Sequence, residues 1–266
     1  MPKNYSFACL GDSITSDEVT GIGTLVCKKL GAELIGNFAH GNATMSDWHD
    51  GSRKLTKLNL NVQPDEWGSD NTLSNQIAKL LQTTTLKNVR ISWQHPICGE
   101  SSLDGICGCA DKSVAPDIVY IAIGINDGKL GDYSRVIDNC DEVFKQDYMS
   151  LDKNSMASSL RWAIETLRSA YPDTLIFVAS PLQTNTDYEP NAFSYDIVLK
   201  KREIIKKVCD YCSVYFIDLY ARSGFSNMLA KYYGDGVHPN AIYKNRIANY
   251  IVHTIRNEMY LVNEEK

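Results

Sequence analysis

The chain alternates short hydrophobic runs with longer segments of helical periodicity. Five runs have the length and composition of strands, and the third is apolar at nearly every position. A run without polar alternation is typical of a central parallel strand that helices cover on both faces. The five predicted strands are Tyr5–Leu10, Leu34–Phe38, Asp117–Ile123, Thr174–Ala179 and Ser213–Leu219.

Between these runs, hydrophobic residues recur at helical spacing. The clearest stripe combines Leu160, Ala163, Ile164 and Leu167. Ile77, Leu80 and Leu81 repeat the start of this pattern. Two further segments with the same periodicity are Asp196–Val208 and Ala241–Ile255. Strands that alternate with helices are joined by right-handed crossovers. We therefore predict a three-layer α/β/α fold. Its sheet should be doubly wound and flavodoxin-like, with about five parallel strands and helices on both faces.

Two segments do not fit this alternation. Residues 45–72 are rich in Asp, Asn, Ser and Trp, and residues 94–116 contain several glycines and three cysteines. We interpret both as loop excursions, and loops of this length often serve function. No composition shift marks a linker, so residues 1–266 are expected to form one domain.

Composition excludes several classes of protein. The 266 residues are 44% hydrophobic and 22% charged, which is ordinary globular usage. A net charge of −5 argues against non-specific nucleic-acid binding, which needs a basic face. No run reaches the ~20 apolar residues of a membrane span. The polar start, Met1–Asn4, has no signal-peptide pattern, so we expect a cytoplasmic protein. The sequence does not indicate an oligomeric state.

The eight cysteines raise the question of a metal site. Cys107 and Cys109 lie near Cys98, and Cys209 and Cys212 are separated by two residues. Four thiolates can hold zinc, but only one pair has two-residue spacing, and it lies where a helix runs into a strand. We favour buried, free thiols and expect neither a metal nor an organic cofactor.

Polar motifs follow the predicted strands, where open parallel sheets bind their ligands. Gly11–Thr15 (GDSIT) puts Ser13 on a turn before a helix, as a nucleophile or as a simple helix cap. Gly124–Gly128 (GINDG) offers Asn126 as an oxyanion donor, or is an ordinary turn. Near the last helix, Asp235–Pro239 (DGVHP) places an aspartate three residues before a histidine, a spacing at which the carboxylate can orient the ring.

In order and context, these three blocks resemble the SGNH (GDSL-type) hydrolase family, from residue 5 to about residue 255. The resemblance implies that Ser13 attacks an acyl carbonyl, with His238 as its general base and Asp235 orienting the ring. It also implies an oxyanion hole built from the Ser13 amide, the Asn126 side chain and an amide from the family's glycine block.

The glycine block is where the sequence departs from the family. The family pattern is Asn-x-Gly-x-x-Gly-x-Thr, whereas residues 37–44 read NFAHGNAT. Aligned on Asn37 and Thr44, the oxyanion glycine falls on Asn42, and Gly41 stands one place earlier. Any residue except proline can offer a backbone amide, and asparagine tolerates a left-handed backbone. Gly41 and Asn42 therefore remain alternatives for the third donor.

The interval between Thr44 and Gly124 is longer than compact family members need, and it holds Trp48, Trp67 and Trp93. These rings either line the substrate cleft or seal a small core under the loops. We take Trp48, together with Asp127 and Tyr233, as candidate substrate-binding residues.

The predicted function is a serine esterase that removes a small acyl group, with acetyl as the expected group and a carbohydrate as a candidate carrier of the ester. The alternatives are a thioesterase or lysophospholipase with the same triad, or a catalytically idle, glycan-binding relative. No G-x-S-x-G, P-loop or H-E-x-x-H motif supports another catalytic template.

Overall fold

The computed structural model describes residues 5–17, 19–47, 72–85, 115–128, 136, 140–185, 190–232 and 234–264. Within these residues, the strands form one parallel sheet in the order β2-β1-β3-β4-β5. The strands are β1 (Ser6–Gly11), β2 (Glu33–Asn37), β3 (Ile118–Ala122), β4 (Leu175–Ala179) and β5 (Tyr215–Ile217). The predicted doubly wound, flavodoxin-like sheet is confirmed.

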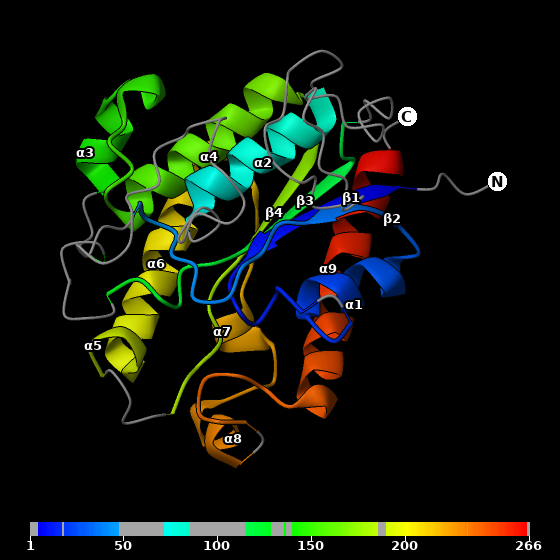
Figure 1. The fold of residues 1–266 in the computed structure, drawn as a ribbon, viewed down its shortest axis with the longest axis vertical. Coiled ribbons are helices and arrows are strands. Elements are labelled where there is room, and N and C mark those ends of the chain that lie inside the picture. Colours follow the sequence, from blue (N-terminus) through cyan, green and yellow to red (C-terminus); the bar gives the residue numbers. More distant parts are fainter. Residues whose placement is uncertain are drawn as a thin grey trace, which may run out of the picture.

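Helices cover both faces of the sheet (Figure 1). One face carries α1 (Ile22–Leu30) and α9 (Ala241–Glu264), which pack against each other. The other carries α2 (Leu73–Thr85), α4 (Met156–Ala170) and α6 (Tyr195–Cys212). The shorter helices are α3 (Cys140–Lys145), η4 (Tyr148–Ser150), α5 (Pro190–Phe193), α7 (Leu219–Arg222) and α8 (Asn227–Tyr232).

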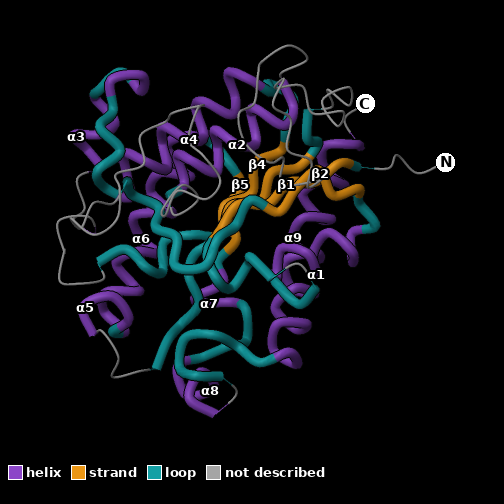
Figure 2. Tube along the Cα trace, viewed as in Figure 1, coloured by secondary structure: helices purple, strands orange, loops and turns teal. Residues whose placement is uncertain are grey.

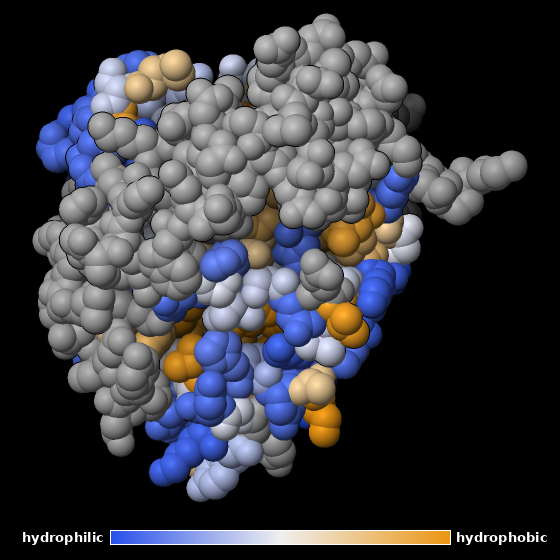
Figure 3. Space-filling model, in the orientation of Figure 1, coloured by the Kyte–Doolittle hydropathy of each residue, from blue (hydrophilic) through white to orange (hydrophobic). Residues whose placement is uncertain are grey.

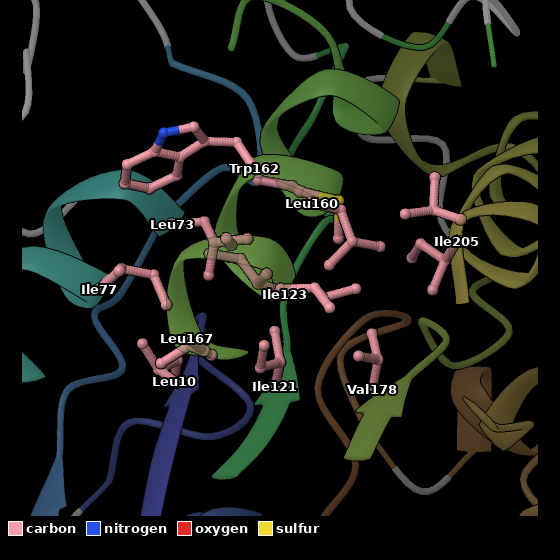
Figure 4. Packing of buried hydrophobic residues seen from close by; sticks show 14 of the residues in the cluster. Leu10, Leu73, Ile77, Ile121, Ile123, Leu160, Trp162, Leu167, Val178 and Ile205 are labelled. Carbon is pink, nitrogen blue, oxygen red and sulfur yellow. The ribbon is translucent and has the colours of Figure 1, made fainter. Parts of the chain in front are cut away.

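Each face of the sheet has its own hydrophobic core, because successive strand residues point to opposite faces. In Figure 4, Leu10, Ile121 and Val178 from three neighbouring strands face the helices that carry Leu160 and Ile205. The whole predicted α4 stripe is buried in this first core. The alternating strand residues lie in the second core, against α1 and α9: Phe7, Cys9, Tyr120, Phe177 and Ala179.

The fifth strand is shorter than predicted at both ends. Ser213 adopts a left-handed conformation with φ of 51° and ends α6, so it does not join the strand. At the other end, the Asp218 side chain accepts a hydrogen bond from Ala221 N and caps α7. Periodicity alone missed both boundaries because capping chemistry, not hydrophobicity, sets them.

The described cysteines behave as small hydrophobic residues. Cys9, Cys27, Cys140, Cys209 and Cys212 are buried and free. Burial raises the pKa of the Cys27 and Cys212 thiols to about 11, which keeps them protonated at neutral pH. Cys98, Cys107 and Cys109 lie outside the described residues. Across the part of the chain that the structure describes, no cluster of His, Cys, Asp and Glu could hold a metal ion.

The surface drawn in Figure 3 is mostly hydrophilic over its described part, with hydrophobic residues between the polar ones. None of the described helices is both long and apolar enough to span a bilayer. Figure 2 shows loops gathered at one edge of the sheet, between the strands and the segments around α7 and α8. Since all five strands are parallel, this edge is built from their carboxyl ends and the segments that follow them.

Candidate active site

The turn after β1 is held by its own backbone and by tight packing. A Cβ on Gly11 would lie 2.6 Å from the Ala122 carbonyl oxygen, so only glycine fits beside β3. The Asp12 carboxylate accepts a hydrogen bond from Ile14 N at 3.1 Å, and the Asp12 carbonyl accepts one from Thr15 N at 3.0 Å. Ser13 therefore sits on a fixed turn, raised from the end of the strand.

Ser13 is not a helix cap. The helix after this turn, α1, begins only at Ile22, and Gly21 is its N-terminal flanking residue, without a side-chain cap. This excludes the simple capping role for Ser13. The chain makes further turns between Ser13 and the start of the helix.

Three side chains from the two ends of the chain form a hydrogen-bonded series. Ser13 Oγ lies 2.7 Å from His238 Nε2, although 225 positions separate the two residues. On the other side of the ring, His238 Nδ1 lies 2.8 Å from Asp235 Oδ2. In the tautomer that this carboxylate favours, Nδ1–H donates to Asp235 and Nε2 accepts from the serine hydroxyl.

The loop that carries the histidine is held by the aspartate itself. Asp235 Oδ1 accepts hydrogen bonds from His238 N at 2.7 Å and Val237 N at 2.9 Å. Partial burial alone raises the pKa of Asp235, but these bonds and the bond from the His238 ring outweigh it and lower the pKa to about 2. The carboxylate is therefore ionised over the whole physiological range.

The turn after β3 presents Asn126 next to the nucleophile turn. Gly124 has a φ of 122°, a conformation that only glycine adopts readily, and it starts this turn. The Asn126 side chain is 4% exposed, and its Nδ2 donates to the Ala43 carbonyl at 2.8 Å. A carboxamide has two N–H groups, so Asn126 has a second one to offer.

Residues 37–43 lie beside the nucleophile turn because they continue the pairing of β2 with β1. Phe38 N donates to Cys9 O at 2.8 Å, and His40 N donates to Gly11 O at 3.1 Å. Asn42 has a φ of 69°, the left-handed conformation that we expected asparagine to tolerate. A Cβ on Gly41 would meet nothing within 4 Å, so this position does not require glycine for space.

Asp127 does not lie where a substrate could reach it. Its side chain is 0% exposed, and its carboxylate accepts hydrogen bonds from Met45 N at 2.8 Å and Ser46 N at 3.0 Å. The Ser46 hydroxyl donates to the same carboxylate. Burial raises the pKa of Asp127, and the bonds from Ser46 and the charge of Lys201 oppose this rise. Asp127 thus holds the 45–46 segment instead of contacting substrate as expected.

Two buried polar residues behind the site were not predicted. Gln76 on α2 bonds both backbone groups of Gly11: its Oε1 accepts from Gly11 N and its Nε2 donates to Gly11 O, each at 2.8 Å. Lys201 on α6 donates to Ile125 O at 2.6 Å. Neither lies in a motif, and Lys201 belongs to a charged run that is typical of a solvated helix face. Only the three-dimensional structure reveals them.

Several predicted residues cannot be placed. Trp48 and Tyr233, the other candidate substrate-binding residues, lie outside the described residues, as do Trp67 and Trp93. Most of the predicted excursions 45–72 and 94–116 also lies outside them. The hypothesis that these segments line the cleft stays a prediction.

Comparisons with known proteins identify a family and a shared fold. The model of the GDSL-like Lipase/Acylhydrolase family matches residues 9–242. A lipase/acylhydrolase from Enterococcus faecalis superposes with a TM-score of 0.53 at 14% identity, covering 96% of each chain. A family two carbohydrate esterase from Clostridium thermocellum, solved with cellohexaose, gives 0.54 at 16% identity, over 97% of this chain and 66% of that one.

A family two carbohydrate esterase from Cellvibrio japonicus also gives a TM-score of 0.54, at 14% identity, over 98% of this chain and 64% of that one. At these identities the superpositions establish a shared fold. None of the curated protein sequences compared with the chain matches it. The family match spans the nucleophile turn, the Asn126 turn and the histidine loop, and the chain therefore belongs to the GDSL-like lipase/acylhydrolase family of carboxylic ester hydrolases.

Proposed function

We propose that this protein is a serine esterase that removes a small acyl group, most simply acetyl, from a carbohydrate ester. The observation that carries the proposal is the series Ser13–His238–Asp235, with two hydrogen bonds of 2.7 and 2.8 Å. A nucleophile in contact with a base that a carboxylate orients is the arrangement that acyl transfer needs.

In the first half of the reaction, Ser13 Oγ attacks the acyl carbon while His238 Nε2 takes the hydroxyl proton. The carbonyl π electrons move to the oxygen, and negative charge develops there. The tetrahedral intermediate then collapses: the ester C–O bond breaks, and His238 gives its proton to the leaving alcohol. The product of this half-reaction is an acyl-enzyme on Ser13.

In the second half, water takes the place of the alcohol. His238 removes a proton from the water as it attacks the acyl-enzyme, and the proton passes to Ser13 Oγ when the acid leaves. Asp235 stays ionised throughout, since its pKa is about 2. It stabilises the imidazolium that forms twice in each cycle.

Developing charge on the carbonyl oxygen needs donors that are already in position. We assign this role to the Ser13 amide, to the second N–H of the Asn126 carboxamide and to the backbone amide of Gly41 or Asn42. The supporting geometry is the contact between Asn126 Nδ2 and Ala43 O, which joins the Asn126 turn to the 41–43 turn. No described group accepts a hydrogen bond from the Ser13 amide, so it is available to the substrate.

One observation favours a carbohydrate ester as the substrate: two of the solved structures that share the fold are titled carbohydrate esterases, one of them bound to cellohexaose.

A fluorophosphonate probe and a series of p-nitrophenyl esters test the proposal. We expect the probe to label Ser13, Ser13→Ala to abolish labelling, and activity to peak at the two-carbon ester. Activity that rises toward eight or more carbons would contradict the acetylesterase proposal and favour a lysophospholipase or thioesterase. A protein that neither labels nor hydrolyses any ester of the series would instead be the idle, glycan-binding relative.

A further inference from the structure

Lys201 is a buried cation immediately behind the Asn126 turn. The side chain is 0% exposed, although lysine is among the residues most rarely buried in this way. Its Nζ donates to Ile125 O at 2.6 Å and to Ala192 O at 2.8 Å, and it lies 5.9 Å from the centre of the Phe193 ring. These contacts come from two separate segments, which the lysine joins.

Burying an ammonium group costs free energy unless it is bonded and its charge is balanced. The two carbonyl oxygens provide the bonds, and the buried carboxylate of Asp127 provides a nearby opposite charge. An apolar side chain of similar length would avoid the cost of a buried charge but would take the donor away from both carbonyl oxygens. The lysine therefore does more than fill space, because it bonds carbonyl oxygens of two separate segments.

The bond to Ile125 bears directly on the proposed oxyanion donor. Ile125 O belongs to the peptide unit whose nitrogen is that of Asn126, so Lys201 fixes the plane from which the Asn126 side chain projects. On the far side of Asn126, the Asp127 carboxylate is held by Met45 N and Ser46 N. The turn is thus fixed at the residue before Asn126 and at the residue after it.

The second bond extends this support toward the histidine loop. Ala192 and Phe193 pack in one buried cluster with Ile125 and Val237, the neighbour of His238. A separate backbone bond, from Asn185 N to Gly236 O at 2.8 Å, ties the segment after β4 to the same loop. Lys201 therefore joins the Asn126 turn to a cluster that also contacts the catalytic loop.

We propose that Lys201 is a positioning residue for the oxyanion hole: it fixes the Ile125–Asn126 peptide and holds a positive charge behind the Asn126 carboxamide. The inference rests on the proposed function, because it assumes that Asn126 donates to the oxyanion. It predicts that Lys201 acts on the transition state through Asn126, and not on substrate binding.

A double-mutant cycle with Lys201→Met and Asn126→Ala tests this, using p-nitrophenyl acetate as substrate. We expect Lys201→Met to lower kcat by about 10- to 100-fold with KM within about threefold, because an oxyanion donor acts mainly in the transition state. In the Asn126→Ala background, the same substitution should change kcat by less than about threefold. Lys200→Met, at an exposed lysine on the same helix, is the matched control and should leave kcat unchanged.

A second readout does not depend on activity. The side-chain amide signal of Asn126, assigned by its loss in Asn126→Ala, should shift in the ¹H–¹⁵N spectrum of Lys201→Met and not in that of Lys200→Met. If Lys201→Met does not fold, Lys201→Gln, which keeps a donor but loses the charge, replaces it in both measurements.

The possible results separate the two proposals. A wild-type protein without esterase activity or Ser13 labelling contradicts the proposed function, while the amide signal still tests the contact. Additive effects in an active enzyme overturn the role of Lys201 and leave the esterase intact, as does an unchanged Asn126 signal. If neither Lys201 variant folds, the lysine serves the fold and the inference is overturned.

Discussion

The two halves of the candidate site are built differently. Asn126 and Asp12 are at most 4% exposed, and bonds from α2, α6 and the 45–46 segment hold their turns. The His238 and Asp235 side chains are 42% and 63% exposed, and the bonds of Asp235 come from its own loop. Substitutions in the buried half should therefore affect both activity and stability. Substitutions in the exposed half should leave stability unchanged.

The largest expected effect lies on the exposed half. His238→Ala should lower kcat by about 10⁶-fold, because members of a triad act as a unit. The free energy of unfolding should change by less than about 0.5 kcal/mol, as for other surface substitutions. Kinetics with p-nitrophenyl acetate and urea denaturation measure the two quantities. A loss of stability comparable to that of a core substitution would contradict the contrast between the halves.

Asp235→Asn should come next, with a loss of kcat of about 10⁴-fold, because the amide no longer selects the tautomer in which Nε2 accepts from Ser13. It should also change the response to acid. The pKa of Asp235 is lowered to about 2, so its contribution to stability is present above its unfolded pKa and is lost as the pH falls toward 2. Acid unfolding of the variant should therefore depend less on pH in this range, by a small amount because the pair is exposed.

A third prediction concerns the buried half. Gln76→Leu leaves Gly11 N–H and C=O without their side-chain partner, and the lost bonds should reduce the free energy of unfolding by about 2–4 kcal/mol. Because Gly11 precedes the nucleophile turn, kcat should also fall, by about tenfold. Gln146→Leu, at an exposed glutamine, is the matched control and should stay within about 0.5 kcal/mol. A stable, fully active Gln76→Leu would show that the bonds position nothing.

The same contrast explains what the sequence could predict. The alternation of apolar strands and striped helices was sufficient for the sheet, since parallel strands and amphipathic helices leave a direct periodic signal. The motifs Gly11–Thr15, Gly124–Gly128 and Asp235–Pro239 were equally visible, because each sits at the end of a strand or the start of a helix. These local patterns therefore identify Ser13, His238 and Asp235, which form the hydrogen-bonded series of the site.

The support behind those residues left no such signal. Gln76 is a single polar position in a helix, and Lys201 stands in a charged run, yet both are fully buried. Their partners, Gly11 and Ile125, are 65 and 76 positions away. No local pattern records which buried carbonyl a distant side chain will meet. Asp127 illustrates the converse, because its place in a motif suggested substrate contact while its real partners lie at residues 45 and 46.

The smallest expected effects distinguish Gly41 from Asn42 in the loop between the two halves. Asn42 has a φ of 69°, so Asn42→Ala should be about 1 kcal/mol less stable than Asn42→Gly, because both variants lose the same side chain and only glycine adopts this conformation without strain. Gly41→Ala should be neutral, since a Cβ there meets no atom within 4 Å. If the amide of Asn42 is the third oxyanion donor, Asn42→Ala should also lower kcat a few-fold, because strain rotates that amide, and Gly41→Ala should not. The reverse order of the two kcat values would assign the donor to Gly41, and equal values would place the third donor outside this loop.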